Sequence, residues 1–183
     1  RHLTEELMDA HADLPILPRH VHLPVQSGSD RVLRRMARRY TRQEYVERTS
    51  RLREKVPGLT LSTDIIVGFP GETEEDFQET LSLVREVGFT PALQLGDDVT
   101  EDQKDDRLQR LFEVLAAQQT THLASLVGTT TRVLVEGPNG ASETRWTGRS
   151  ERHELVHLEA PEGVDPTGRL VEVEIERAFD HSL

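Results

Sequence analysis

Two short segments, each running from an apolar strand into a glycine turn and then into a helix, constrain the fold of this chain more than any other feature. They are residues 22–29 (HLPVQSGS) and residues 62–73 (STDIIVGFPGET). Two such units in succession form a strand–helix–strand module with parallel strands. Both turns then open at the same end of the sheet, where α/β folds place their chemistry. The polar residues of the two turns are therefore the first candidates for a functional site.

Apolar spacing, capping patterns and helix breakers divide the first part of the chain into elements. We expect helices at residues 3–14, 30–36, 41–56, 73–87 and 100–127, and strands at residues 20–26 and 59–67. Ser29 fits a helix N-cap. The apolar face of the long last helix consists of Leu108, Leu111, Phe112, Leu115, Leu123 and Leu126. A third parallel strand should follow Gly88, but residues 89–99 are too short and too broken to form a good one.

The pattern changes after Gly128. Four short alternating strands are expected at residues 132–136, 144–148, 154–158 and 169–175, with turns rich in glycine and proline between them. That spacing predicts a small antiparallel barrel. The fold class is therefore α/β, with one domain at residues 1–118 and an all-β domain at residues 119–183.

The composition excludes several classes of function. The chain has 183 residues, a formal net charge of -11 and no cysteine, so it offers no disulfide, no thiolate zinc site and no iron–sulfur ligand. It has no P-loop, His-Glu-x-x-His or Gly-x-Ser-x-Gly motif. No apolar run approaches the roughly 18 residues that span a bilayer, and nothing resembles a signal peptide. We expect no membrane partner and a cytoplasmic location.

The first glycine turn offers Gln26, Ser27 and Gly28 at the point where a strand meets a helix N-terminus. Backbone N–H groups bind anions there, and small side chains let a carboxylate or a phosphate approach closely. The alternative is that these residues only cap the helix and reverse the chain.

The second strand carries Asp64 among apolar residues. A buried carboxylate is costly unless it is paired or hydrogen-bonded. By alternation Asp64 shares a face with Ile66 and Gly68, where it can contact a ligand hydroxyl or a cation, or pair with a nearby arginine. The following glycines, Gly68 and Gly71, let the backbone approach a flat ligand, unless they serve the turn alone.

A run of six arginines within residues 31–42 flanks the first turn of this acidic chain. Arg38 and Arg39, close to the start of the next helix, are the best candidates to hold a carboxylate, a phosphate or an RNA backbone. The alternative is a solvated helix face. His20 and His22 share a strand face, but two ligands do not make a metal site, so we expect a packed or substrate-facing pair.

The second domain offers a basic and aromatic surface for RNA. Its candidates are Arg132, Arg145, Trp146, Arg149 and Arg152. Acidic residues outnumber arginines in this domain, so any RNA-binding face is local. A tryptophan in a small barrel also commonly packs in the core or at its rim.

Four motifs resemble the methylthiotransferases of the radical S-adenosylmethionine superfamily. They are residues 22–29, residues 36–40 (MARRY), residues 64–73 (DIIVGFPGET) and Asp76-Phe77. The last strands resemble the OB-like, RNA-binding barrel called TRAM. The resemblance implies the C-terminal half of a radical SAM (β/α) barrel followed by a TRAM barrel.

The resemblance also implies cofactors. One 4Fe-4S cluster would cleave S-adenosylmethionine to a 5′-deoxyadenosyl radical, a second 4Fe-4S cluster would deliver sulfur, and another S-adenosylmethionine would supply the methyl group. Gln26, Ser27 and Gly28 would line the cofactor pocket. Asp64 and Gly68 would face its ribose or adenine, and Arg38 would lie near its carboxylate or the substrate.

The motifs most resemble enzymes that add a methylthio group to C2 of N6-isopentenyladenosine at tRNA position 37, with tRNA and sulfur and electron donors as partners. Relatives that modify a ribosomal protein or threonylcarbamoyladenosine in tRNA, and a non-catalytic RNA-binding fragment, remain alternatives. Both clusters would be held by cysteines outside this chain, which alone would be inactive. Thr90 also runs directly into Pro91 where the family has a further strand, so we expect residues to be missing there.

Overall fold

The computed structural model describes residues 3–90, 92–96, 101–140 and 144–183. The chain divides into two compact units. The first contains residues 1–17 and 21–118, and the second contains residues 18–20 and 119–183. Each unit has a hydrophobic core of its own.

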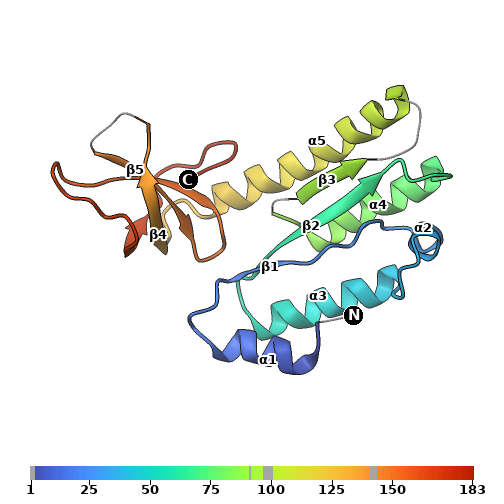
Figure 1. Cartoon of the computed structure of the whole chain (residues 1–183), viewed down its shortest axis with the longest axis horizontal. Helices are drawn as coiled ribbons and strands as arrows, with labels where there is room; N and C mark the ends of the chain where they lie inside the picture. The colour runs from blue at the N-terminus through green and yellow to red at the C-terminus, as the bar shows by residue number, and fades with distance from the viewer. Residues whose placement is uncertain (1–2, 91, 97–100, 141–143) are drawn as a thin grey trace. The chain divides into compact units, whose positions relative to one another are not determined.

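The first unit is built on a three-stranded sheet with the order β1-β2-β3. The strands are β1 (His20–His22), β2 (Thr60–Val67) and β3 (Ala92–Gly96). The helices before β3 are α1 (Glu5–Asp13), α2 (Asp30–Arg35), α3 (Arg42–Lys55) and α4 (Glu74–Val87). Figure 1 shows α3 and α4 along the same side of β1 and β2. This is the expected strand–helix–strand module.

The strand β3 corrects the expectation that residues 89–99 form no good strand. Ala92–Gly96 pairs in parallel with β2, with Thr63 opposite Ala92 and Val67 opposite Gly96. The reason is that β2 presents a row of unpaired N–H and C=O groups at its edge, and a segment of five residues is enough to pair with them. Strand propensity within the short segment does not reveal such an edge.

Capping side chains fix where the helices begin. Thr41 and Glu44 form a reciprocal capping box at α3, and Thr73 and Asp76 form one at α4, as described for reciprocal caps. At the other end of α4, Gly88 adopts the left-handed conformation with φ 66°, which costs glycine little. The turns on either side of α4 are therefore set by local chemistry.

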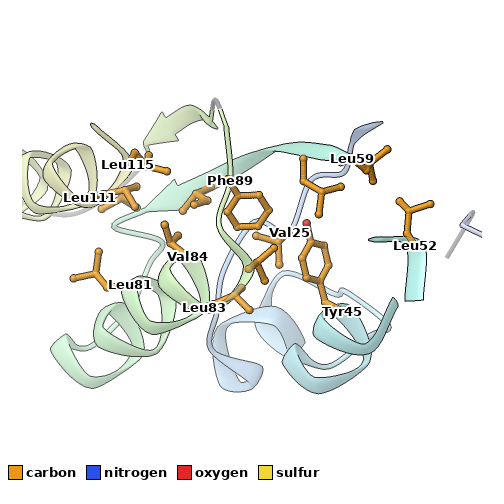
Figure 2. Packing of buried hydrophobic residues seen from close by; sticks show 14 of the residues in the cluster. Val25, Tyr45, Leu52, Leu59, Leu81, Leu83, Val84, Phe89, Leu111 and Leu115 are labelled. Atoms are coloured by element: carbon orange, nitrogen blue, oxygen red, sulfur yellow. The ribbon is translucent and has the colours of Figure 1, made fainter. Parts of the chain in front are cut away.

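The core of the first unit lies on one face of β2. Leu61, Ile65 and Val67 are buried there, whereas Asp64 and Ile66 on the opposite face are partly exposed. Figure 2 shows core side chains from α3 and α4 pointing toward the strands. One face of β2 is thus packed, and the face that carries Asp64 is open.

The helix α5 (Glu101–Ser125) buries a different row from the one expected. Arg107, Leu111 and Leu115 are buried, whereas Phe112 is 48% exposed. Residues four apart lie on one helix face, and Phe112 is turned away from that face. Arg107 replaces an apolar residue in the buried row because an acidic partner, described below, compensates its charge.

The second unit is an antiparallel sheet with the order β6-β5-β4-β7. Its strands are β4 (Thr130–Pro138), β5 (Arg145–Ser150), β6 (Leu155–Glu159) and β7 (Leu170–Glu174). After β7 the chain returns to the edge of β6, where Leu183 N–H donates to the Leu155 carbonyl and His157 N–H donates to the Leu183 carbonyl. The result is a curled, barrel-like sheet in which Val133, Val156 and Ile175 are buried.

We predict that Gly28→Ala destabilises the first unit by about 1–3 kcal/mol, the usual cost of forcing extra atoms into a packed site. A Cβ at Gly28 would lie 2.5 Å from the Glu79 carbonyl oxygen and 2.5 Å from the Thr80 Cα, and both atoms belong to the α4 backbone. Urea unfolding followed by circular dichroism measures the change. Gly137→Ala is the matched control, because a Cβ there meets nothing within 4 Å. Equal midpoints for the two variants would contradict the prediction.

Candidate functional site

The segment before the first turn is held against β2 partly by a side chain. Pro24 has no N–H to donate, so it interrupts the ladder. The Thr63 hydroxyl fills this gap, accepting from the Val25 N–H and donating to the Leu23 carbonyl, both at 2.9 Å. The buried backbone groups around the proline are thereby satisfied.

Gln26 follows this segment in a strained conformation. Its N–H donates to the Asp64 carbonyl (2.9 Å) and its carbonyl accepts from the Ile66 N–H (2.8 Å). Its φ is 70°, in the left-handed region that non-glycine residues seldom occupy and that is enriched at functional sites. The structure therefore brings Gln26 and Asp64 onto neighbouring segments at one end of the sheet.

Two tyrosine hydroxyls complete this edge of the site. Tyr45 donates to the Leu23 carbonyl (2.7 Å) and Tyr40 donates to the Val25 carbonyl (3.0 Å). Burial raises the pKa of both hydroxyls, and the positive charge of Arg38 partly offsets this for the pKa of Tyr40. The exposed Arg38 is thus placed near the carbonyl that precedes Gln26.

Ser27 and Gly28 are turned toward α4. Ser27 is 0% exposed, and the Gly28 N–H donates to the Thr80 hydroxyl at 2.9 Å. The Ser29 N–H donates to the Ser27 hydroxyl at 3.2 Å. The N–H groups that the sequence offered to an anion are therefore occupied within the protein.

Asp76 ties the two glycine turns together. Its carboxylate accepts from the Ser29 hydroxyl (2.6 Å), from the Thr73 N–H and hydroxyl (both 2.8 Å) and from the Arg31 guanidinium. Arg31 also donates to the Gly71 carbonyl (2.7 Å). Ser29 stands at the N-cap of α2 as expected, but its side chain makes no capping bond, because it serves Asp76 instead. The hydrogen bonds from Arg31, supported by those from Ser29 and Thr73, hold the pKa of the Asp76 carboxyl well below its usual range.

The turn after β2 closes on a buried ion pair. Gly68, with φ 76°, donates its N–H to Glu72 Oε2 at 2.8 Å. Arg107 of α5 lies 2.9 Å from the same oxygen, and the two side chains are 0% and 9% exposed. Burial raises the pKa of Glu72, against the opposing effects of the Gly68 N–H and Arg107. The other oxygen, Oε1, is buried without a hydrogen-bond partner among the described residues.

On the open face of β2, Asp64 meets a histidine. The Oδ2 atom of Asp64 lies 3.4 Å from Nε2 of His22, and their side chains are 23% and 45% exposed. The other ring nitrogen, Nδ1, is 2.9 Å from the Ser62 hydroxyl. The partner of Asp64 is therefore a histidine from the neighbouring strand rather than one of the nearby arginines.

The predicted RNA-binding arginines of the second unit each have an acidic neighbour. The pairs are Arg132 with Glu151, Arg145 with Glu159, Arg149 with Glu136 and Arg152 with Glu154. The first three pairs are exposed or half-exposed, and such pairs contribute little stability. The Arg152 pair differs, because Glu154 is buried and also contacts His122 of α5 at 2.8 Å.

Trp146 does not lie on the same face as these arginines. Along β5, Arg145 is exposed and Arg149 partly exposed, whereas Trp146, Gly148 and Ser150 are buried. Trp146 is only 8% exposed, so its ring is not available as a stacking surface for a base. The pleat of the strand explains the correction, because adjacent residues point to opposite faces.

The described residues hold no cluster of three or more histidine, aspartate or glutamate side chains arranged for a metal ion. The sequence has no cysteine, so these residues do not fit an iron–sulfur cluster. In the part of the chain that the structure describes, no helix is both long and apolar enough to span a membrane.

Comparison with known proteins identifies both units. Residues 1–84 match the Radical SAM superfamily and residues 124–183 match the TRAM domain. The whole chain is 60% identical, over 202 residues, to tRNA-2-methylthio-N(6)-dimethylallyladenosine synthase of Sorangium cellulosum strain So ce56. This chain belongs to the radical SAM methylthiotransferase family. Synthases of the same name from Bordetella petrii and Syntrophobacter fumaroxidans are each 43% identical, over 100% and 99% of the chain.

The chain covers 41%, 40% and 42% of the length of these three methylthiotransferase relatives. The matched stretches span 202, 196 and 194 residues, against 183 in the chain. The relatives therefore contain residues that this chain lacks. That agrees with a shortened sequence, but the junction of Thr90 and Pro91 lies at the edge of the described residues, so its position stays a prediction.

Sequence reasoning missed several residues that shape the site. Thr63 and the two tyrosine hydroxyls were not singled out, although Pro24 inside a strand signals that other groups must satisfy the backbone. Arg107 was overlooked, although it lies one turn before Leu111 in the buried row of α5. The contact of His22 with Asp64 required the register of β1 against β2, which local pattern does not give.

We predict that Asp76→Asn lowers the free energy of unfolding at pH 7 by about 1–3 kcal/mol, because Arg31 and Ser29 lose a charged acceptor. The folded-state pKa of Asp76 is lowered, so its contribution is complete above the ordinary pKa of about 4 and is lost as pH falls below it. The wild type should therefore lose stability more steeply than Asp76→Asn between about pH 5 and pH 2. Urea unfolding at several pH values measures this, with the exposed Glu75→Gln as control. Parallel pH profiles for wild type and Asp76→Asn would contradict it.

Proposed function

We propose that the protein to which this chain belongs adds a methylthio group to C2 of N6-isopentenyladenosine at position 37 of tRNA. The observation that carries this proposal is the 60% identity, across the whole chain, to a synthase named for that modified nucleoside. Isopentenyl and dimethylallyl denote the same five-carbon group. The TRAM unit supports an RNA substrate.

We also propose that the open end of the first unit holds S-adenosylmethionine. Asp64 offers a partly exposed carboxylate suited to ribose hydroxyls. Gln26 and Gly68, both at positive φ, bring the backbone to the same end of the sheet, and Arg38 supplies an exposed cation for the cofactor carboxylate. Ser27 and Gly28 act in this proposal by docking the turn on α4. The bound cofactor supplies radical chemistry, whereas this chain supplies binding and orientation.

The two 4Fe-4S clusters of this proposal are held by cysteines outside the chain, since none of its own residues fit them. Reduction of a cluster and replacement of sulfur require electron and sulfur donors. A tRNA substrate places the reaction in the cytoplasm. The competing possibility, favoured by the absence of cysteine in the chain itself, is that this fragment binds RNA without catalysis.

The function is tested by expressing the full-length protein in bacteria that make N6-isopentenyladenosine but lack the methylthio enzyme. We expect 2-methylthio-N6-isopentenyladenosine to appear when digested tRNA is analysed by mass spectrometry, with an equal loss of the unmethylthiolated nucleoside. Methylthiolation of threonylcarbamoyladenosine or of a ribosomal protein instead would reassign the substrate. A soluble, cluster-loaded protein that modifies none of these would overturn the proposal.

We predict that Arg145→Ala combined with Arg149→Ala weakens tRNA binding by the full-length enzyme about three- to thirtyfold, and lowers the slope of log affinity against log salt by up to about one per lost phosphate contact. Filter binding at several salt concentrations measures both quantities. Arg85→Ala on α4 removes one arginine charge from the other unit and should change neither quantity. Equal affinities for the double variant and the wild type would remove this face from the RNA site.

A further inference from the structure

His22 lies between two side chains of β2 on the open face of the sheet. Its Nδ1 is 2.9 Å from the Ser62 hydroxyl, and its Nε2 is 3.4 Å from Asp64 Oδ2. Ser62 and Asp64 are two residues apart on one strand, so both point to the same face. The imidazole therefore spans one side of β2 alongside the residues of the candidate site.

The protonation pattern of this arrangement follows from its chemistry. Asp64 is an acceptor when ionised, so the nitrogen that faces it is favoured to carry a proton. In the neutral ring the other nitrogen, Nδ1, then accepts from the Ser62 hydroxyl. The serine thereby selects the tautomer and holds the plane of the ring, and the ring presents Nε2–H to one oxygen of the carboxylate.

This contact leaves the second carboxylate oxygen of Asp64 available. Within the described part of the chain, Oδ1 has no recorded hydrogen bond, and the Asp64 side chain is 23% exposed on the open face. A carboxylate held at one oxygen is fixed in rotation, so its other oxygen has a defined direction. His22 is half-exposed, which leaves it close to whatever Asp64 contacts.

We propose that His22 is a positioning residue that orients Asp64 toward the ribose hydroxyls of S-adenosylmethionine, and that Ser62 sets the tautomer of the histidine. The inference rests on the proposed cofactor site. It assigns to His22 an effect on cofactor affinity that acts through Asp64. The relevant property is the donor at Nε2, and the bulk and aromaticity of the ring are secondary.

The two amide substitutions of His22 separate these properties. Glutamine places its side-chain NH2 near the position of Nε2, whereas asparagine reaches only the position of Nδ1. In the full-length, cluster-loaded enzyme, we expect His22→Asn and His22→Ala to raise the dissociation constant for S-adenosylmethionine about tenfold, the factor that corresponds to loss of one charge-assisted contact. His22→Gln should stay within about threefold of wild type. Anaerobic equilibrium dialysis without tRNA measures the affinity.

Asp64→Asn and the melting temperature of each variant complete the experiment. If Asp64→Asn binds the cofactor like wild type, the proposed cofactor site is wrong and the inference fails with it. If Asp64→Asn weakens binding but His22→Ala does not, only the inference fails. If the asparagine and glutamine variants lose the same affinity together with melting temperature, His22 is structural and the inference is overturned. Unchanged melting temperatures with affinity retained by glutamine alone support it.

Discussion

The position of the candidate site depends on how a proline-interrupted segment is held against β2. Pro24 removes one ladder donor, and the Thr63 hydroxyl takes over that part of the pairing. The two tyrosine hydroxyls then satisfy carbonyls of the same segment. This hydrogen bonding places Gln26 beside Asp64 with its φ at 70°. Without it, a residue in such an unfavourable conformation would relax into ordinary extended backbone.

Two buried acids then hold the glycine turns in place. Asp76 joins the first turn to the start of α4, and Glu72 joins the second turn to Arg107 of α5. Both carboxylates accept several hydrogen bonds, which is what makes a buried charge tolerable. Rigidity at this end of the sheet is therefore electrostatic as well as apolar. Ser27 and Gly28, which look like ligand contacts in the sequence, belong to this supporting structure.

Local rules predicted much of the fold because they act over a few residues. The two capping boxes and the apolar rows of α3 and α4 follow directly from spacing. The strand β3, the outward turn of Phe112 and the burial of Trp146 did not follow from spacing. Each depends on what a distant segment offers: the free edge of β2, the acidic partner of Arg107, or the pleat of β5. The contact of His22 with Asp64 likewise depends on the register of two strands.

The paired arginines of the second unit have a consequence for any polyanion that binds there. A phosphate that takes Arg149 must displace Glu136, which lies 3.7 Å from it. The released carboxylate then repels neighbouring phosphates along the same strand of RNA. Such a surface admits an RNA whose backbone bends away from the freed acids, and it disfavours a uniform duplex. Shape discrimination would thus arise from exchange of partners, with no contact to a base.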